Sequence, residues 1–345
     1  MLDLPTTQAR DVSEQSSHSE GVRLLVAMPA LNEDRTIEDM IRRVPRDLPG
    51  VSQVDVLVVD DGSTDSTSSK AAAAGAQVIS HGQQLGVGAA FHTALRAAMN
   101  LGSDLLVTID SDGQFDPATI ADIVAPVIDG RADFVTASRF ADPARIPQMP
   151  AVKKWGNRVM SKLISSIIHQ KFFDVSCGMR CYNREAIVRL TLTGSFTYTQ
   201  EVFLNLAFKR MRIMEVPITV RGVREFGKSR VASSILRYAI NTATIILRTY
   251  RDYKPMRFFG RLALLFGIPG VLLSLFLLVH VLMTGSFTPH KWAGFTGGTF
   301  ILLGLVFLHM GIIGDMLDRH RIYLEEVLYM VRQSSGQDRN GDQKR

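Results

Sequence analysis

The amino-acid sequence predicts an α/β domain with a mainly parallel sheet, followed by an interfacial amphipathic helix and a two-helix transmembrane hairpin. Three observations lead to this fold class. Between residues 22 and 138, apolar β-branched runs alternate with helical stretches. A segment with helical apolar spacing follows the domain, and two long segments after it contain no Asp, Glu, Lys or Arg. Alternation of strand and helix is typical of parallel sheets that are covered on both faces.

Five runs in the N-terminal half are rich in β-branched and apolar residues, and we predict a strand in each. The expected strands are residues 22–28, 54–60, 76–80, 104–110 and 132–138. The stretches between them have helical spacing, and the expected helices are residues 33–44, 66–75, 87–100 and 117–129. Ligands of such sheets bind beyond the carboxyl ends of the strands. Every acidic motif of this half lies at that edge.

The first and second predicted strands both end in acidic motifs, MPALNED and VVDDGSTDST. Asp60 and Asp61 leave the second strand, and Gly62 permits a turn. These residues can serve simply as helix caps. Two acidic strand ends in one crevice, however, repel each other unless a cation or a donor-rich ligand lies between them.

The fourth predicted strand ends in LLVTIDSDGQFDP. Residues i and i+2 of a strand share a face, so Asp110 and Asp112 are expected to point to one place. Carboxylate oxygens of this kind suit Mg²⁺ or Mn²⁺ shared with a phosphate. The alternative is an ordinary strand end, where Asp and Gly are common turn residues.

The C-terminal part of the chain contains two charge-free segments, Leu262–Met283 and Ala293–Ile313. Each has about the ~20 residues that a helix needs to cross a bilayer. The alternative is a pair of buried helices in a soluble core. We predict a transmembrane hairpin over residues 262–313.

The charged residues around the hairpin predict its orientation. Basic residues precede the first span and follow the second, whereas the short connection has one Lys, so the positive-inside rule places both termini in the cytoplasm. Residues 232–261 have helical apolar spacing with basic margins, which favours an amphipathic helix on the membrane over an ordinary surface helix. The basic residues in question are Arg248, Arg251, Lys254, Arg257, Arg261, Arg319 and Arg321.

The two ends of the chain are polar. Residues 1–20 lack the apolar core of a signal peptide, and we expect a disordered lead-in. Residues 314–345 are expected to form a cytoplasmic tail, partly helical and then disordered.

The net charge of +6 suits a nucleic acid, a membrane surface or an anionic substrate. The basic residues gather beside the apolar spans and not on an aromatic-rich face, so we predict a membrane and no nucleic acid as partner. Cys177 and Cys181 have no nearby His, and we interpret them as small buried residues and not as zinc ligands.

The motifs together resemble a known family. MPALNED, VVDDGSTDST, DSDGQ, the ASR of Ala137–Arg139 and the REFGKSR of Arg224–Arg230 occur in the order seen in family-two glycosyltransferases of the GT-A fold. With the C-terminal hairpin, the chain most resembles the polyprenyl-phosphate glycosyltransferases, the dolichol-phosphate mannose synthase group. The resemblance implies that residues 21–231 form a cytoplasmic glycosyltransferase domain.

The resemblance also implies residue roles. Asp112 and Gln114 would hold Mg²⁺ or Mn²⁺ and the donor diphosphate. The positions that match donor-binding residues are Pro29, Leu31, Glu33, Val59, Asp60, Asp61, Asp110, Ser111 and Lys228. The implied catalytic residues are Asp110, Asp112, Arg224 and Arg230.

Other matching segments concern the acceptor and the sugar. Asp174–Ala186 is expected to shape the sugar pocket, and Glu201 either touches sugar hydroxyls or begins a helix. The loop Arg224–Arg230 is expected to act as a lid over the diphosphate. The positions that match the lipid-phosphate region are Arg139, Lys153, Lys154 and Arg158, although the last three also suit a solvated helix face.

The predicted function is the metal-dependent, inverting transfer of a hexose from a nucleotide diphosphate sugar to a polyprenyl (dolichyl or undecaprenyl) phosphate on the cytoplasmic membrane face. Mannose from GDP-mannose is favoured over glucose or N-acetylglucosamine from a UDP-sugar. The alternatives are a membrane-bound family-two transferase that elongates a glycan or glycolipid, and a non-catalytic membrane scaffold. The oligomeric state is left open, with a homo-oligomer as one alternative.

Overall fold

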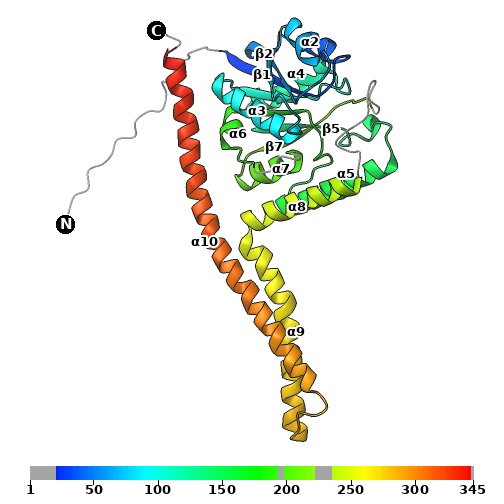
Figure 1. Ribbon diagram of the computed structural model, residues 1–345, viewed down its shortest axis with the longest axis vertical. Coiled ribbons are helices and arrows are strands. Elements are labelled where there is room, and N and C mark those ends of the chain that lie inside the picture. Colours follow the sequence, from blue (N-terminus) through cyan, green and yellow to red (C-terminus); the bar gives the residue numbers. More distant parts are fainter. Residues whose placement is uncertain (1–20, 193–197, 222–234, 343–345) are drawn as a thin grey trace, which may run out of the picture.

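The computed structural model describes residues 21–192, 198–221 and 235–342. An α/β domain lies above a pair of long helices that run away from it (Figure 1). The predicted fold class is confirmed. The lead-in of residues 1–20 lies outside the described residues, as does the loop Arg224–Arg230.

A seven-stranded sheet forms the centre of the domain, in the order β3-β2-β1-β4-β6-β5-β7. The pairs β1–β2, β1–β4, β2–β3 and β5–β7 are parallel, and only β6 runs antiparallel to its two neighbours. The sheet is therefore mainly parallel, as predicted. The strands are β1 (Val22–Ala30), β2 (Val51–Asp60), β3 (Gln77–Ser80), β4 (Leu105–Thr108), β5 (Phe134–Ser138), β6 (Arg180–Asn183) and β7 (Ile213–Pro217).

Both faces of the sheet are buried, which is why its strands read as continuous apolar runs. Along β1, Leu24 and Val26 belong to one hydrophobic core, and Leu25 and Ala27 belong to the core on the opposite face. The helices of the domain are α1 (Ile37–Arg42), α2 (Thr67–Ala73), α3 (Val87–Asn100), α4 (Ile120–Ile128, after a 3-10 turn at Pro117–Thr119), α5 (Ala151–Ile168), α6 (Arg184–Arg189) and α7 (Thr199–Phe208).

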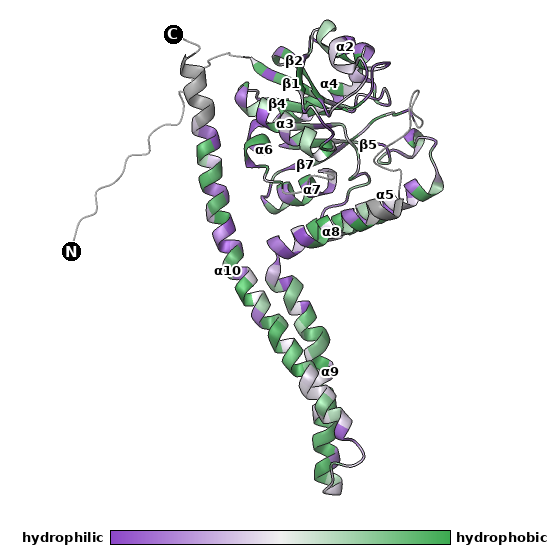
Figure 2. Ribbon diagram, viewed as in Figure 1, coloured by the Kyte–Doolittle hydropathy of each residue, from purple (hydrophilic) through white to green (hydrophobic). Residues whose placement is uncertain are grey.

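Three helices follow the domain: α8 (Ile235–Tyr253), α9 (Pro255–Thr284) and α10 (Lys291–Asp342). α9 and the first part of α10 are long and apolar enough to span a membrane, and only 6 % and 11 % of their most apolar windows are buried in the protein. A helix of a soluble core would be mostly buried, so these two need another apolar environment. Figure 2 shows the apolar residues covering α9 and the adjoining part of α10.

The distal part of α10 returns to the domain and packs beside α6 (Figure 1). The Tyr329 hydroxyl donates a hydrogen bond to Glu185 Oε2 at 2.9 Å, and Arg332 Nη1 donates to the carbonyl of Val188 at 2.7 Å. Glu325 lies 2.7 Å from Arg321 Nη1 and 3.3 Å from Lys209 Nζ on the domain. One unbroken helix therefore joins the apolar hairpin to the α/β domain.

Candidate active site

The carboxyl ends of β1, β2 and β4 bring three predicted motifs to one edge of the sheet. Pro29 at the end of β1 is in register with Val59 of β2. The Ser111 hydroxyl, in the loop after β4, donates a hydrogen bond to the carbonyl oxygen of Pro29 at 2.8 Å. The sheet register therefore places residues of all three motifs next to one another.

Asp60, at the end of β2, is only 3 % exposed. Its carboxylate accepts hydrogen bonds from Ser63 N at 2.9 Å, Ser68 Oγ at 2.6 Å and Ser80 Oγ at 3.2 Å. Burial alone would raise the pKa of Asp60, but these hydrogen bonds outweigh it and lower the pKa below its usual value. A fixed negative charge therefore stands at this edge near neutral pH.

Asp61 holds the loop that precedes α3. Its carboxylate accepts hydrogen bonds from Leu85 N at 2.9 Å and Gly86 N at 2.8 Å. His81 Nδ1 lies 2.9 Å from Asp61 Oδ1, and His81 Nε2 lies 2.9 Å from Thr93 Oγ1. Sequence reasoning missed His81, although its position directly after β3 places it at the same edge. In this structure Asp61 shapes the edge through its contacts with the loop.

The loop after β4 carries Asp110 and Asp112. The expectation that both lie on one face of the strand is wrong, because β4 ends at Thr108 and both residues belong to the following loop. Asp112 is 3 % exposed, and its Oδ1 accepts a hydrogen bond from Gln114 N at 3.0 Å. Thr36 Oγ1 donates to the carbonyl of Ser111 at 2.7 Å and fixes the loop against α1.

Asp110 lies directly against Gly178, a residue that sequence reasoning did not single out. A Cβ added at Gly178 would lie 2.6 Å from Asp110 Oδ2 and 2.8 Å from Oδ1. Side chains essentially never approach so closely, so position 178 must lack one if the Asp110 carboxylate is to keep this place. The antiparallel pairing of β4 with β6 brings the two residues together.

Replacing Gly178 by Ala should therefore displace the Asp110 carboxylate. We expect the turnover number of the reaction at this site to fall by about tenfold to a hundredfold, since a misplacement near 1 Å can cost about that much. Gly156→Ala on α5 is the matched control, because a Cβ there meets no heavy atom within 4 Å. Equal turnover in the two variants would contradict the importance of this contact.

Arg180, which begins β6, supports the segment that contains Gly178. Its guanidinium is fully buried, with Nε donating to the carbonyl of Cys177 at 2.8 Å and Nη2 to that of Val175 at 3.1 Å. The rings of Phe134, Tyr198 and Phe203 lie 5.2–5.6 Å from it. Carbonyl oxygens and aromatic faces thus stabilise a cation inside the domain.

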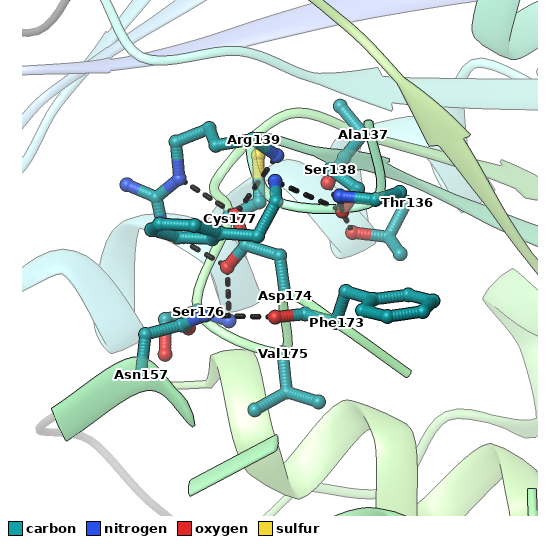
Figure 3. Close-up of polar contacts among 12 residues, drawn as sticks. Thr136, Ala137, Ser138, Arg139, Asn157, Phe173, Asp174, Val175, Ser176 and Cys177 are labelled. Carbon is teal, nitrogen blue, oxygen red and sulfur yellow. Dashed lines mark hydrogen bonds and ion pairs between the residues drawn. The ribbon is translucent and has the colours of Figure 1, made fainter. Parts of the chain in front are cut away.

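Arg139, just past β5, forms a two-pronged ion pair with Asp174 (Figure 3). Arg139 Nε and Nη2 lie 2.6 and 2.9 Å from the two carboxylate oxygens, and the backbone N of Arg139 donates to the same carboxylate at 3.1 Å. Burial alone would lower the pKa of Arg139, but the Asp174 carboxylate raises it further above its usual value, with a smaller contribution from Asp110. Arg139 therefore provides a permanent positive charge within electrostatic reach of Asp110.

Glu215 on β7 holds the backbone of the segment that contains Asp174. Its carboxylate accepts hydrogen bonds from Phe173 N at 2.9 Å and Asp174 N at 2.6 Å, and burial raises its pKa. From α5, Asn157 Nδ2 donates to the carbonyl of Phe173 at 2.8 Å, as Figure 3 also shows. Strand β7 and helix α5 together hold the residue that positions Arg139.

The other predicted acceptor residues lie on α5. Lys153 and Arg158 are exposed and Lys154 is partly exposed, which does not separate a phosphate site from a solvated helix face. Leu31 and Glu33 follow β1 at the same sheet edge as Pro29. Arg224, Lys228 and Arg230 lie outside the described residues, so the structure does not place them.

The acidic loop offers oxygen ligands for part of a divalent-cation site. Within the described residues no group of three or more His, Cys, Asp or Glu side chains could hold a metal ion unaided. Asp112 and Gln114 nevertheless lie together in the loop, and Mg²⁺ commonly takes one or two protein carboxylates and completes its shell with substrate phosphates and water. The residues present fit an ion that is shared with a phosphate-bearing ligand. Cys177 and Cys181 are free and buried, as expected.

Comparison with known proteins identifies the class of the protein. Residues 25–191 match the family model described as Glycosyl transferase family 2. The chain therefore contains a domain of glycosyl transferase family 2 and is a glycosyltransferase, as its motifs predicted.

Two curated relatives are similar to this chain in sequence. The chain is 29 % identical over 220 residues to the UDP-N-acetylglucosamine–dolichyl-phosphate N-acetylglucosaminyltransferase of Methanococcus voltae, and this alignment covers 56 % of the chain and 84 % of the relative. It is 26 % identical over 325 residues to an undecaprenyl-phosphate 4-deoxy-4-formamido-L-arabinose transferase of Salmonella choleraesuis, and that alignment covers 89 % of the chain and 94 % of the relative. The second alignment spans most of both chains.

A solved structure shows the same fold. Glucosyl-3-phosphoglycerate synthase of Mycobacterium tuberculosis, crystallised with Mn²⁺, UDP and glucosyl-3-phosphoglycerate, superposes with a TM-score of 0.52. The match has 22 % identity and covers 66 % of this chain and 80 % of that chain. It supports a GT-A-like α/β domain and, at this identity, the fold alone.

Proposed function

We propose that the protein transfers a sugar from a nucleotide diphosphate sugar to a polyprenyl phosphate at the cytoplasmic face of a membrane. The observation that carries the proposal is the acidic edge of Asp60, Asp110 and Asp112, with the Arg139 cation within electrostatic reach of Asp110, in a domain followed by two apolar helices. The names of the two curated relatives, both polyprenyl-phosphate sugar transferases, support the acceptor class.

The donor that we propose is a UDP-sugar. The preference for GDP-mannose in the sequence analysis rested on the dolichol-phosphate mannose synthase group as a whole. The name of the Methanococcus relative specifies UDP-N-acetylglucosamine, which supports a uridine nucleotide.

The proposed roles follow from the chemistry of the acceptor. A phosphate monoester has a second pKa of about 6, so its attacking oxygen is already anionic and little help from a general base is needed. The protein must instead hold two anions together. Asp110 would orient the sugar, and Asp112 and Gln114 would hold Mg²⁺ or Mn²⁺. Arg139, positioned by Asp174, would receive the acceptor phosphate. A divalent ion, when bound, would neutralise the leaving diphosphate. Attack opposite the leaving group would invert the anomeric carbon.

The decisive experiment is incubation of the purified full chain with undecaprenyl or dolichyl phosphate and a panel of radiolabelled UDP- and GDP-sugars. Label should move into a lipid that yields the sugar on mild acid hydrolysis. Transfer from a GDP-sugar only would refute the proposed donor. Transfer only to glycan or glycolipid hydroxyls would replace the proposed acceptor with an elongation reaction.

The orientation of the hairpin can be tested separately. If both termini are cytoplasmic, a membrane-impermeant maleimide added outside intact cells should label Thr288→Cys and not Ser334→Cys. The native cysteines provide a low background, because Cys177 and Cys181 are both buried. The reverse labelling pattern would place the α/β domain outside, away from the cytoplasmic supply of sugar nucleotides.

A further inference from the structure

The two apolar helices form a groove to which the function proposed above assigns no role. It lies between α9 and α10, has a volume of about 790 Å³ and is lined mainly by apolar side chains and glycines. Arg257 and Arg261, one helical turn apart, lie at its end nearest α8, and its described lining contains no Asp or Glu. The groove is thus apolar along its length and positively charged at one end.

Glycines create the groove. A Cβ added at Gly260 or Gly267, both in the lining, would meet no heavy atom within 4 Å. A Cβ at Gly304 would instead lie 3.1 Å from the backbone of Ala263 and Gly267. Gly304 therefore lets the two helices approach closely, whereas Gly260 and Gly267 leave open space on the groove side.

The length of the groove along α9 matches the thickness of one leaflet of a bilayer. The part of α9 from Arg261 to Leu272 is about 16 Å long at 1.5 Å per residue. That is close to half of the ~30 Å hydrocarbon core of a bilayer. Leu264 and Ile268 on its wall are 61 % and 55 % exposed, so the groove opens to the surrounding lipid. An acyl chain from one leaflet fits this length, whereas a polyprenyl chain is several times longer.

We propose that this groove binds one anionic phospholipid of the cytoplasmic leaflet. One acyl chain lies along Gly260 and Gly267, and the phosphate lies between Arg257 and Arg261 at the level of the head groups. The cytoplasmic leaflet is the one that carries anionic lipids. Arg257 and Arg261 belong to the first turns of α9, and this end of the helix is the one nearest the α/β domain (Figure 1). The proposal rests on the membrane placement of α9 and α10 and on the cytoplasmic orientation proposed above, and it is independent of the sugar, the donor and the acceptor.

Native mass spectrometry of the delipidated full chain in detergent tests the proposal. The probes are dioleoyl phosphatidylglycerol, dioleoyl phosphatidylcholine, which has the same chains, and undecaprenyl phosphate. We expect one retained phosphatidylglycerol, bound about tenfold or more tightly than phosphatidylcholine, because each arginine near the surface attracts the anionic head group. Equal binding of the two phospholipids would overturn the proposal. If undecaprenyl phosphate displaces bound phosphatidylglycerol when it is present at a lower concentration than phosphatidylglycerol, the groove belongs to the acceptor. That result would also overturn the proposal.

Filling the groove should remove the lipid without disturbing the helix pair. Gly267→Leu should weaken phosphatidylglycerol binding at least tenfold, and Gly260→Leu should do the same from the basic end. The matched control is Gly298→Leu on α10, where a Cβ also meets nothing within 4 Å and which lies outside the groove lining. The double variant Arg257→Gln, Arg261→Gln should bind both phospholipids equally.

These outcomes separate the lipid site from the catalytic proposal. If both filled-groove variants bind phosphatidylglycerol like the parent, or if Gly298→Leu weakens binding as much as they do, the groove is not the site. Circular dichroism and gel filtration of each variant show whether the chain has folded. Failure of sugar transfer with intact phosphatidylglycerol binding would count against the proposed function alone.

Discussion

Asp112→Ala should lower the rate of sugar transfer by about a hundredfold or more while the protein still folds. Removal of one group that stabilises developing charge costs on the order of a hundredfold to a thousandfold in enzymes of other classes. Asp112 is 3 % exposed in a loop that is also fixed by the Thr36 hydroxyl and by Ser111, so the loop keeps other contacts when the carboxylate is lost. Transfer rates and thermal unfolding of the two proteins give the comparison.

Two controls make this prediction specific. Asp129→Ala removes an exposed carboxylate at the end of α4, on the opposite edge of the sheet, and should transfer sugar at the parent rate. Chelation by EDTA should abolish transfer by the parent, and added Mg²⁺ or Mn²⁺ should restore it. Binding of Mn²⁺, followed by electron paramagnetic resonance in the presence of the nucleotide, should weaken in Asp112→Ala and not in Asp129→Ala. Full activity of the parent in excess chelator would refute the assignment of a metal to this loop.

The sequence predicted β1 to β5, which are five of the six strands that run in the same direction, because strands buried on both faces give long apolar runs. It missed β6 and β7. The β6 strand is the four residues RCYN, beginning with an arginine that is fully buried, so neither its length nor its polarity resembles a central strand. Only its neighbours β4 and β5 make it a strand. A local pattern cannot report pairing that is created by residues far along the chain.

The same limit applies to the site. The acidic motifs are local, and their place after apolar strands was sufficient to predict that they meet at one edge. The contact of Asp110 with Gly178 and the ion pair of Arg139 with Asp174 join residues far apart in sequence. The resemblance to the glycosyltransferase family places Arg139 in the acceptor-phosphate region, and that role remains a proposal. The structure adds the ion pair of Arg139 with Asp174, which the spacing of residues in the sequence does not predict.

The second large effect is expected at Asp174. This carboxylate is fully buried and accepts three hydrogen bonds from Arg139 as well as one from Ser176 N. Asp174→Ala would leave the Arg139 guanidinium without its partner, and removal of one member of a buried ion pair costs about 3–5 kcal/mol. We expect the unfolding midpoint of the α/β domain to fall by roughly 10 °C, since 1 kcal/mol corresponds to about 2–4 °C in a domain of this size.

The comparison pair is Arg131 with Asp129, which are 2.9 Å apart but about half exposed. Exposed ion pairs contribute about 0–1 kcal/mol, so Asp129→Ala should change the midpoint very little. A double variant, Asp174→Asn with Arg139→Gln, removes both charges at once. It should be less destabilised than the sum of the two single variants, because each single variant leaves one buried charge alone and the double variant leaves none. If Asp174→Ala unfolds at the same temperature as Asp129→Ala, the pair does not hold this part of the site together. Arg139 would then be free to serve the acceptor phosphate without the support of Asp174.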